Sequence, residues 1–261
     1  MLRPRIIPCL LVRNKGLVKT IKFDNPKYVG DPINAVKIFN EKEADELIVF
    51  DIDATVNGTD PDYAMIKKLA AECRMPLCYG GGIRKIDQAR QIIGLGVEKV
   101  AISSAALRDP ELIEGIAGEI GSQSVVVVLD VRKSLFGRYE VVTHNGRKGT
   151  GLLPWEAARK AENLGAGEIV INSVDRDGEM KGYDMDLAPR VRDSVALPMS
   201  VLGGAGSLDD IGRLIETCGV VGAAAGSLFV FKGPYRAVLI NYPNTLERQA
   251  LADRVKSNDR I

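Results

Sequence analysis

Short apolar runs rich in β-branched residues recur along the chain, and a polar or glycine-containing turn and a helix-like segment follow each of them. The runs are nearly continuous in hydrophobicity rather than alternating, which is typical of parallel strands covered on both faces. We expect strands at residues 5–12, 46–51, 76–80, 99–103, 124–130, 168–171, 199–202 and 221–225. The clearest helices are expected at residues 32–42, 62–72, 85–93, 154–164 and 208–217.

This alternation of strands and helices over about 250 residues predicts an α/β protein with the (β/α)8 TIM-barrel fold. A doubly wound open sheet is the alternative. It requires a glycine-rich GxGxxG loop after the first strand, and residues 12–16, VRNKG, do not match that pattern. We therefore expect residues 1–261 to form a single barrel domain.

The chain also resembles itself, because Pro32 recurs 122 positions later as Pro154 and Leu10–Arg13 parallels Leu129–Arg132. Further matched pairs are Ala35 and Ala157, Ala44 and Ala166, Glu46 and Glu168, Asp51 and Asp175, and Ser104 and Ser227. Chance similarity between βα units is the alternative. The repeat predicts two half-barrels, at about residues 1–120 and 121–240, and an extra helical tail at about residues 244–261.

Glycines and serines stand at the carboxyl ends of four predicted strands, on the face where active sites of such barrels form. Glycine lets backbone N–H groups approach an anion, serine adds a hydroxyl donor, and a helix N-terminus favours negative charge. Two repeat-related sites predict a ligand with a phosphate at each end, whereas tight turning without a ligand is the alternative. The candidate phosphate-binding residues are Gly81, Gly82, Ser103, Ser104, Gly203, Gly204, Gly226, Ser227 and Lys19.

Composition excludes several other classes. The 35 Lys and Arg residues against 34 Asp and Glu residues leave a net charge of +1, with no electrostatic footprint for nucleic acid. No apolar run approaches the roughly 20 residues of a membrane helix, and the start of the chain lacks the features of a signal peptide. The four cysteines have no CxxC spacing, and one histidine gives little basis for triad or multi-histidine metal chemistry. We expect a cytoplasmic protein with no nucleic-acid or membrane partner.

Longer motifs carry a resemblance that extends from about residue 3 to residue 240. They are Ile6–Leu10, Ala44–Leu47, Gly80–Arg84, Asp175–Gly178, Gly182–Asp184 and Gly203–Gly206. In order and spacing they resemble the cyclase subunit of imidazole glycerol phosphate synthase, HisF. The resemblance implies a partnership with a glutaminase (HisH-like) subunit, whose ammonia crosses the barrel to the opposite face. There it meets a ribotide with two phosphates, in a lyase reaction of histidine biosynthesis.

Four charged residues stand at the starts of predicted strands, where they would surround the amino-end mouth of the barrel: Arg5, Glu46, Lys99 and Glu168. A stabilising salt-bridge layer is one interpretation, because charges at this end of a barrel usually serve stability. The resemblance implies instead that they form the entrance gate of an ammonia channel. It also implies that Glu98 lies at the glutaminase interface.

The family pattern breaks at the site of chemistry. The resemblance implies two catalytic aspartates, of which Asp130 is the second, and the first position holds Leu11. The repeat independently pairs Leu11 with Asp130, and losing a positioned acid–base group costs about 10² to 10⁴ in rate. Three more departures are Asp53 for threonine, Ser103 for asparagine and Leu202 for serine. Asp130 and Asp177 remain as catalytic candidates, and Lys19 and Asp51 are also kept.

Two smaller expectations concern the same face. Residues Lys15–Lys19 are expected to open a long loop suited to closing over an anionic ligand, with a solvated charged loop as the alternative. Asp51 and Asp53, with the two catalytic candidates, would make an acidic mouth. We favour carboxylates spread among loops, and therefore predict no metal and no cofactor.

Three functions remain open. The first is a diverged HisF-like paralogue that passes ammonia to another acceptor, as in amidation of a surface-polysaccharide (lipopolysaccharide) sugar, where a third, ATP-dependent enzyme carries out the acceptor chemistry. The second is an active histidine-pathway cyclase in which Asp130 and Asp177 suffice. The third is a non-catalytic binding barrel, which the intact ring of charges argues against. Leu11 favours the first.

Overall fold

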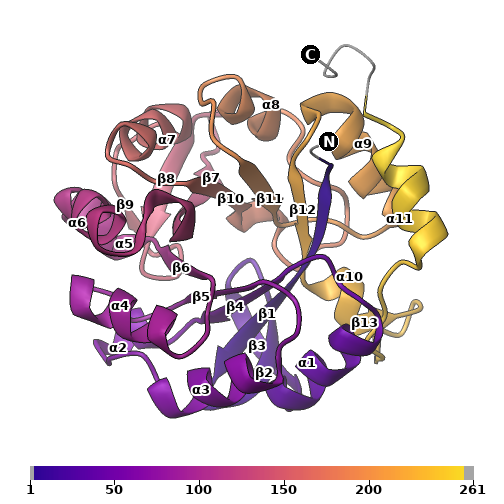
Figure 1. Cartoon of the computed structure of the whole chain (residues 1–261). Coiled ribbons are helices and arrows are strands. Elements are labelled where there is room, and N and C mark those ends of the chain that lie inside the picture. Colours follow the sequence, from indigo (N-terminus) through magenta and orange to yellow (C-terminus); the bar gives the residue numbers. More distant parts are fainter. Residues whose placement is uncertain (1–2, 256–261) are drawn as a thin grey trace.

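The computed structural model describes residues 3–255. Within them, eight parallel strands form a closed barrel (Figure 1). The barrel is closed because β10, at one end of the order of these eight strands, is hydrogen-bonded to β7, at the other end. The barrel strands are β1 (Arg5–Arg13), β4 (Leu47–Asp51), β5 (Leu77–Gly80), β6 (Lys99–Ile102), β7 (Val125–Lys133), β10 (Glu168–Ser173), β11 (Met199–Leu202) and β12 (Gly222–Ala225). The predicted (β/α)8 fold is confirmed.

Helices surround the barrel (Figure 1). The longer ones are α1 (Pro32–Glu41), α3 (Tyr63–Glu72), α4 (Ile86–Gly94), α6 (Glu111–Ile120), α7 (Pro154–Asn163), α8 (Leu187–Arg192), α9 (Leu208–Cys218) and α11 (Thr245–Ala252). Short helices α2 (Ala54–Asn57), α5 (Ser104–Arg108) and α10 (Ser227–Val230) follow barrel strands directly. Each of the five helices expected from sequence is present, with its ends within one residue of the expected ones.

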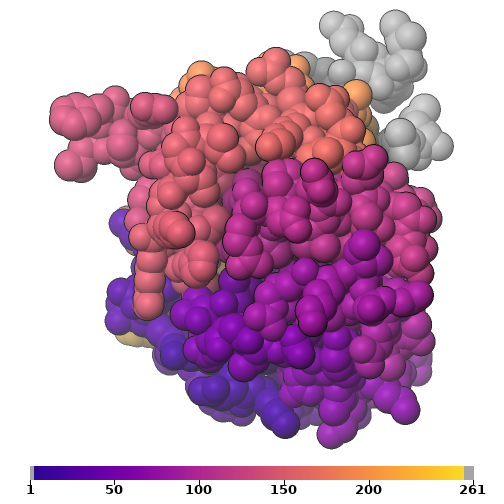
Figure 2. Space-filling view, turned by 90° about the vertical axis from the view of Figure 1, so that its left-hand side faces the viewer, coloured from indigo at the N-terminus to yellow at the C-terminus, as the bar shows by residue number. Residues whose placement is uncertain are grey.

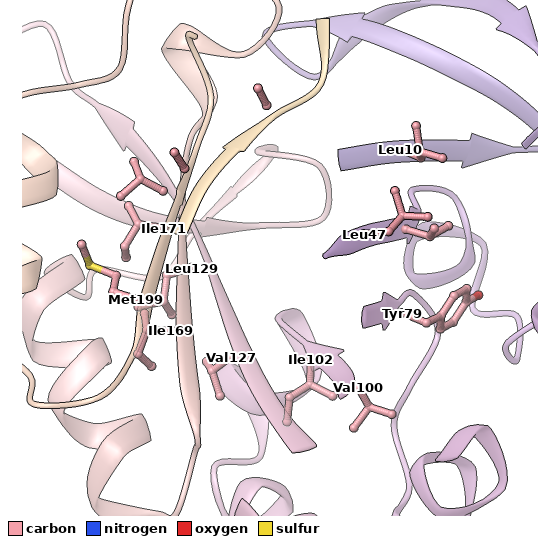
Figure 3. Packing of buried hydrophobic residues seen from close by; sticks show 14 of the residues in the cluster. Leu10, Leu47, Tyr79, Val100, Ile102, Val127, Leu129, Ile169, Ile171 and Met199 are labelled. Carbon is pink, nitrogen blue, oxygen red and sulfur yellow. The ribbon is translucent and has the colours of Figure 1, made fainter. Parts of the chain in front are cut away.

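The barrel walls separate two apolar layers. Side chains that point outward from the strands pack under the helices; those labelled in Figure 3 come from seven of the eight barrel strands. Side chains that point inward form a second cluster along the barrel axis: Ile7, Cys9, Ile48, Cys78, Ala101, Val126, Val128, Val170, Leu202 and Ala224. Burial on both faces explains why the strands are continuously apolar in sequence.

The strand register supports the predicted match between Leu11 and Asp130. Leu11 lies opposite Phe50 in the next parallel strand, and Asp130 lies opposite Asn172. Phe50 and Asn172 are 122 positions apart, the spacing of the sequence repeat. The two halves therefore place Leu11 and Asp130 at equivalent points of the barrel.

One matched pair, Asp51 with Asp175, is wrong. A Cβ on Gly81 would meet the Asp51 carbonyl oxygen at 2.5 Å, and a Cβ on Gly203 would meet the Ser173 carbonyl oxygen at 2.6 Å. These two glycines turn the chain in the same way, so Asp51 corresponds to Ser173. Matching the aspartates by residue type placed them two positions out of register.

The expected long loop after Lys15 is also wrong. Residues 16–30 form a hairpin of β2 (Gly16–Ile21) and β3 (Asp24–Gly30), and β2 pairs antiparallel with β1. Leu17 and Val18 are buried, which fixes this hairpin on the barrel. A second hairpin of β7, β8 (Tyr139–Thr143) and β9 (Lys148–Gly149) extends beyond the carboxyl end of β7.

The tail forms the expected helix, α11, which contacts α9 and buries Leu251. Before it lies a small hairpin of β13 (Phe231–Lys232) and β14 (Ala237–Val238). The last residues of the predicted tail, 256–261, lie outside the described residues. No helix within residues 3–255 has the length and apolarity to cross a membrane.

Candidate functional site

A pocket opens at the carboxyl ends of the barrel strands, where the glycine loops and the two large hairpins surround it. Of the predicted site residues it gathers Leu11, Lys19, Gly81, Gly82, Ser103, Ser104, Asp130, Asp177, Gly203, Gly204, Gly226 and Ser227. The sequence therefore located the pocket lining, while the roles of these residues remain predictions. The pocket also includes Asn172 and Phe50, which sequence reasoning did not select.

Asp130 lies at the carboxyl-end side of β7 and is held by Asn172, whose Nδ2 donates to Oδ1 of Asp130 at 3.0 Å. Burial raises the pKa of Asp130 to about 7, although the Asn172 hydrogen bond opposes this shift. The other amide atom of Asn172, Oδ1, is buried and has no hydrogen-bond partner within residues 3–255. The sequence could have indicated Asn172, because it is a polar residue directly after the predicted strand 168–171.

Asp177 faces the same pocket from the loop after β10. Its Oδ2 accepts hydrogen bonds from the Thr20 hydroxyl at 2.7 Å and from the Phe23 backbone N–H at 3.2 Å. Burial raises the pKa of Asp177 despite these bonds and the nearby cation of Lys19. Two carboxyls with raised pKa values in one pocket are suited to proton transfer near neutral pH.

Lys19 is a buried cation on β2 that reaches the pocket. Its Nζ donates to the Cys9 carbonyl oxygen at 2.6 Å, and burial lowers its pKa. A Cβ on Gly226 would lie 2.4 Å from this Nζ, so Lys19 stands directly against the glycine that precedes Ser227. Within residues 3–255, Lys19 forms no salt bridge, which leaves its charge available to an anion.

The first half of the barrel lines the pocket with apolar side chains at the corresponding positions. Leu11 and Phe50 pack against the inner apolar cluster, which includes Leu202. Leu11 is the counterpart of Asp130, and Phe50 is the counterpart of Asn172. The hydrogen-bonded polar pair of one half is therefore an apolar pair in the other half.

The two glycine loops have backbone conformations that side chains rarely adopt. Gly81 and Gly82 have φ of +125° and +75°, and Gly203 and Gly204 have φ of +94° and +113°. Tight turning alone thus accounts for these glycines. An independent polar feature is the Ser103 hydroxyl, which lines the pocket, is buried and lacks a hydrogen-bond partner in the described part of the chain.

The expected acidic mouth is wrong for Asp53. Its Oδ2 lies 2.8 Å from Nε of Arg13, and Asp53 is not among the pocket residues. Asp51 uses Oδ1 to accept the backbone N–H groups of Asp53 and Ala54, both at 3.1 Å. Across residues 3–255, no three His, Cys, Asp or Glu side chains are grouped so as to hold a metal ion.

At the opposite end of the barrel, the four predicted charges form a closed ring of alternating sign. The Lys99 ammonium lies 2.8 Å from carboxylate oxygens of both Glu46 and Glu168. The Arg5 guanidinium pairs with Glu46 and lies 2.7 Å from Glu168. Burial alone would raise the pKa of Glu168, but the two cations hold it at about 2. Each charge of the ring is therefore paired with two charges of opposite sign.

Ser200 is an additional member of this ring that sequence reasoning missed. Its hydroxyl donates to Oε1 of Glu168 at 2.6 Å and accepts from Arg5 at 3.4 Å. The exposed Glu98, next to Lys99, lies at the same end of the barrel and accepts the Leu77 backbone N–H at 2.7 Å. Within residues 3–255, the inner apolar cluster lies between the ring and the pocket.

The barrel, its pocket between two glycine loops and the charged ring at its opposite end define a (β/α)8 protein with a pocket on the face where active sites of such barrels form. The chain belongs to the family described as histidine biosynthesis protein, which it matches over residues 5–235.

Individual relatives agree with this assignment. A Leptospira interrogans protein, provisionally named an imidazole glycerol phosphate synthase subunit HisF, is 56% identical over 96% of this chain and 99% of its own length. A Pseudomonas aeruginosa protein provisionally named hisF2 is 52% identical over 94% of this chain and 97% of its own. The HisF subunit of Alkaliphilus metalliredigens is 41% identical over 88% and 91%.

Proposed function

We propose that this chain is the synthase-side subunit of a glutamine amidotransferase that passes ammonia to an acceptor other than the histidine-pathway ribotide. Amidation of a surface-polysaccharide sugar, completed by an ATP-dependent enzyme in the cytoplasm, is the reaction class we favour. The observation that carries this proposal is Leu11, which stands with Phe50 where the second half has Asp130 and Asn172. Leucine cannot transfer a proton, so the two-sided acid–base arrangement of a cyclase is incomplete.

The ring of charges supports retention of the ammonia path. Arg5, Glu46, Lys99 and Glu168 form a complete ring, and a core of small and apolar side chains continues from it to the pocket. Neutral ammonia partitions into such a core far better than a charged ion does. We infer that a HisH-like glutaminase docks at this end, beside Glu98.

A phosphorylated ligand is the second part of the proposal. In the described part of the chain, Lys19 has no carboxylate partner and the Ser103 hydroxyl has no hydrogen-bond partner, and both residues line the pocket next to the glycine loops. Phosphate would satisfy the lysine charge and the backbone N–H groups of the loops. The numbered name hisF2 of one relative fits an additional copy beside a histidine-pathway enzyme.

A histidine-pathway cyclase is the second candidate, because Asp130 and Asp177 share one pocket and both have raised pKa values. The deciding experiment is ammonia-dependent turnover of the histidine-pathway bisphosphate by the purified chain, with a two-aspartate cyclase as the positive control. We expect turnover at least about 10²-fold below that control. Comparable turnover would refute the proposal, and restoration by Leu11→Asp alone would mean that little else in the pocket has changed.

A further inference from the structure

The hairpin between β7 and β8 carries two large, exposed apolar side chains at its tip. Leu135 and Phe136 are fully exposed, with Phe136 at 99%. They stand in the turn between Ser134 and Gly137, which a backbone hydrogen bond of 2.9 Å closes. The pink arm that projects on the left of Figure 2 is this hairpin. Adjacent exposed apolar side chains on a projecting hairpin indicate a contact surface.

The arm is also basic. Residues 132–148 contain five Lys or Arg residues and one glutamate, whereas the whole chain has a net charge of +1. Lys133 pairs with Asp186 at 3.2 Å, but Arg132 and Arg138 form no ion pair within residues 3–255. A partner with an acidic surface would therefore be complementary in charge to this hairpin.

The base of the same hairpin lines the pocket. His144 and Asn145 belong to its returning end and are pocket residues, and Asn145 donates from Nδ2 to the Ile52 carbonyl oxygen at 2.9 Å. Asp130 lies on the outgoing strand, opposite Val142. The arm therefore starts at the pocket, and a protein that holds its tip lies on the side of the barrel where the pocket opens.

We propose that the β7–β8 hairpin is the docking arm for the protein that consumes the ammonia, an enzyme whose surface presents an apolar pocket within an acidic patch. This proposal rests on the proposed function. Leu135 and Phe136 insert into the apolar pocket of the partner enzyme, and Arg132 and Arg138 pair with the acidic residues around that pocket. A second copy of this chain fits less well, because two basic arms would repel each other.

Photo-crosslinking identifies the occupant. The variant Phe136→p-benzoylphenylalanine, expressed in the native organism, is irradiated and its adducts are identified. The expected adduct is an acidic, ATP-consuming enzyme that incorporates glutamine nitrogen into its product. An adduct only with a second copy of this chain, only with lipid, or no adduct at all would overturn the docking proposal.

The rate of nitrogen transfer then measures docking, with the full complex of glutaminase, this chain and the cross-linked enzyme. The double variant Leu135→Ser/Phe136→Ser is expected to lower the glutamine-dependent rate at least about tenfold. When ammonium salt replaces glutamine, the rate with the double variant should equal the rate with the wild type, because ammonia in solution reaches the acceptor enzyme without docking of the two proteins. The matched control is Leu246→Ser, which removes another exposed leucine, 81% exposed, from α11. A double variant within twofold of the wild type in the glutamine assay would contradict the proposal.

The charge component has its own measurement. Arg132→Gln/Arg138→Gln is expected to slow association several-fold at low salt, and the difference from the wild type should shrink as salt is raised. A salt-independent effect would contradict an acidic rim. Failure of the proposed function would give a different result from failure of the docking proposal. The wild-type complex would then transfer no nitrogen to an acceptor outside the histidine pathway, and substitutions at residues 135 and 136 would make no difference.

Discussion

Asn172 donates a hydrogen bond of 3.0 Å to Asp130, and the equivalent pair in the other half of the barrel is Phe50 and Leu11. A ligand that spans the pocket would thus meet a hydrogen-bonding surface on one side and an apolar surface on the other. A cyclase that works from both sides of its substrate needs proton transfer at each. The asymmetry concerns a pair of residues in each half, so it is larger than the loss of one carboxylate.

The Asn172 hydrogen bond stabilises the ionised form of Asp130 and lowers its pKa. Asn172→Ala is therefore expected to raise the pKa of Asp130 above its value of about 7. Carbon-detected NMR titration of the aspartate carboxyls measures this shift. Asn145→Ala is the matched control, because the Asn145 amide donates to the Ile52 carbonyl oxygen. An unchanged Asp130 titration in Asn172→Ala would show that the bond does not tune this carboxyl.

The raised pKa of Asp130 predicts a pH-dependent stability. The folded pKa of about 7 lies above the ordinary value of 3.8, so the folded state binds the proton more tightly than the unfolded chain does. The stabilisation that protonated Asp130 contributes to the folded state is fully present below about pH 4 and is lost as pH rises to about 7. Asp130→Asn cannot ionise, so its Tm relative to the wild type should increase between pH 4 and pH 7 and then remain constant. A difference that is flat across this range would contradict the burial argument.

Sequence patterning predicted the barrel strands because they are buried on both faces and are therefore continuously apolar. It predicted the longer helices because each buries one face against the barrel and is apolar on that face. It failed at residues 16–30, where the charged segment Lys15–Lys19 suggested the start of a long loop. The hairpin forms there because buried Leu17 and Val18 outweigh those charges. Pocket residues at strand ends were predictable from the barrel topology. The partners of Asp53 and Asp130 were not, because Arg13 and Asn172 approach them only through the register of neighbouring strands.

The charged ring should contribute to stability whether or not ammonia passes through it. Glu168→Gln leaves Arg5 and Lys99 each with one carboxylate, and breaking such a buried pair costs about 3 kcal/mol. Denaturant unfolding at pH 7 measures the loss. Because the Glu168 pKa is lowered to about 2, its stabilisation should fade as pH drops from about 4.5 towards 2. Ser200→Ala, which removes only the hydroxyl bonded to Glu168, should cost about 1 kcal/mol.

Leu11→Asp tests how far the first half has adapted to an apolar side chain. The new carboxyl would face Phe50 and the inner cluster without a counterpart of Asn172 to bind it. We expect a loss of about 2 kcal/mol in unfolding free energy, as for a buried polar group without a partner. The double variant Leu11→Asp/Phe50→Asn recreates the Asp130–Asn172 pair in the first half and should recover part of the loss. Equal stability of wild type and Leu11→Asp would mean that the site still accepts an aspartate freely.

Lys19 should determine whether the pocket binds phosphate. Its buried ammonium has a lowered pKa and, within residues 3–255, no carboxylate partner, so an anion beside Gly226 would stabilise the folded state. Inorganic pyrophosphate at about 100 times its Kd would add about 2.7 kcal/mol, a rise in Tm of several degrees for a chain of this size. Lys19→Met keeps the length of the side chain and removes the charge. We expect it to raise the Tm without ligand, because the buried ammonium is removed, and to abolish the rise caused by pyrophosphate. Thermal shifts with and without ligand measure both effects, and an undiminished pyrophosphate response in Lys19→Met would place the anion elsewhere.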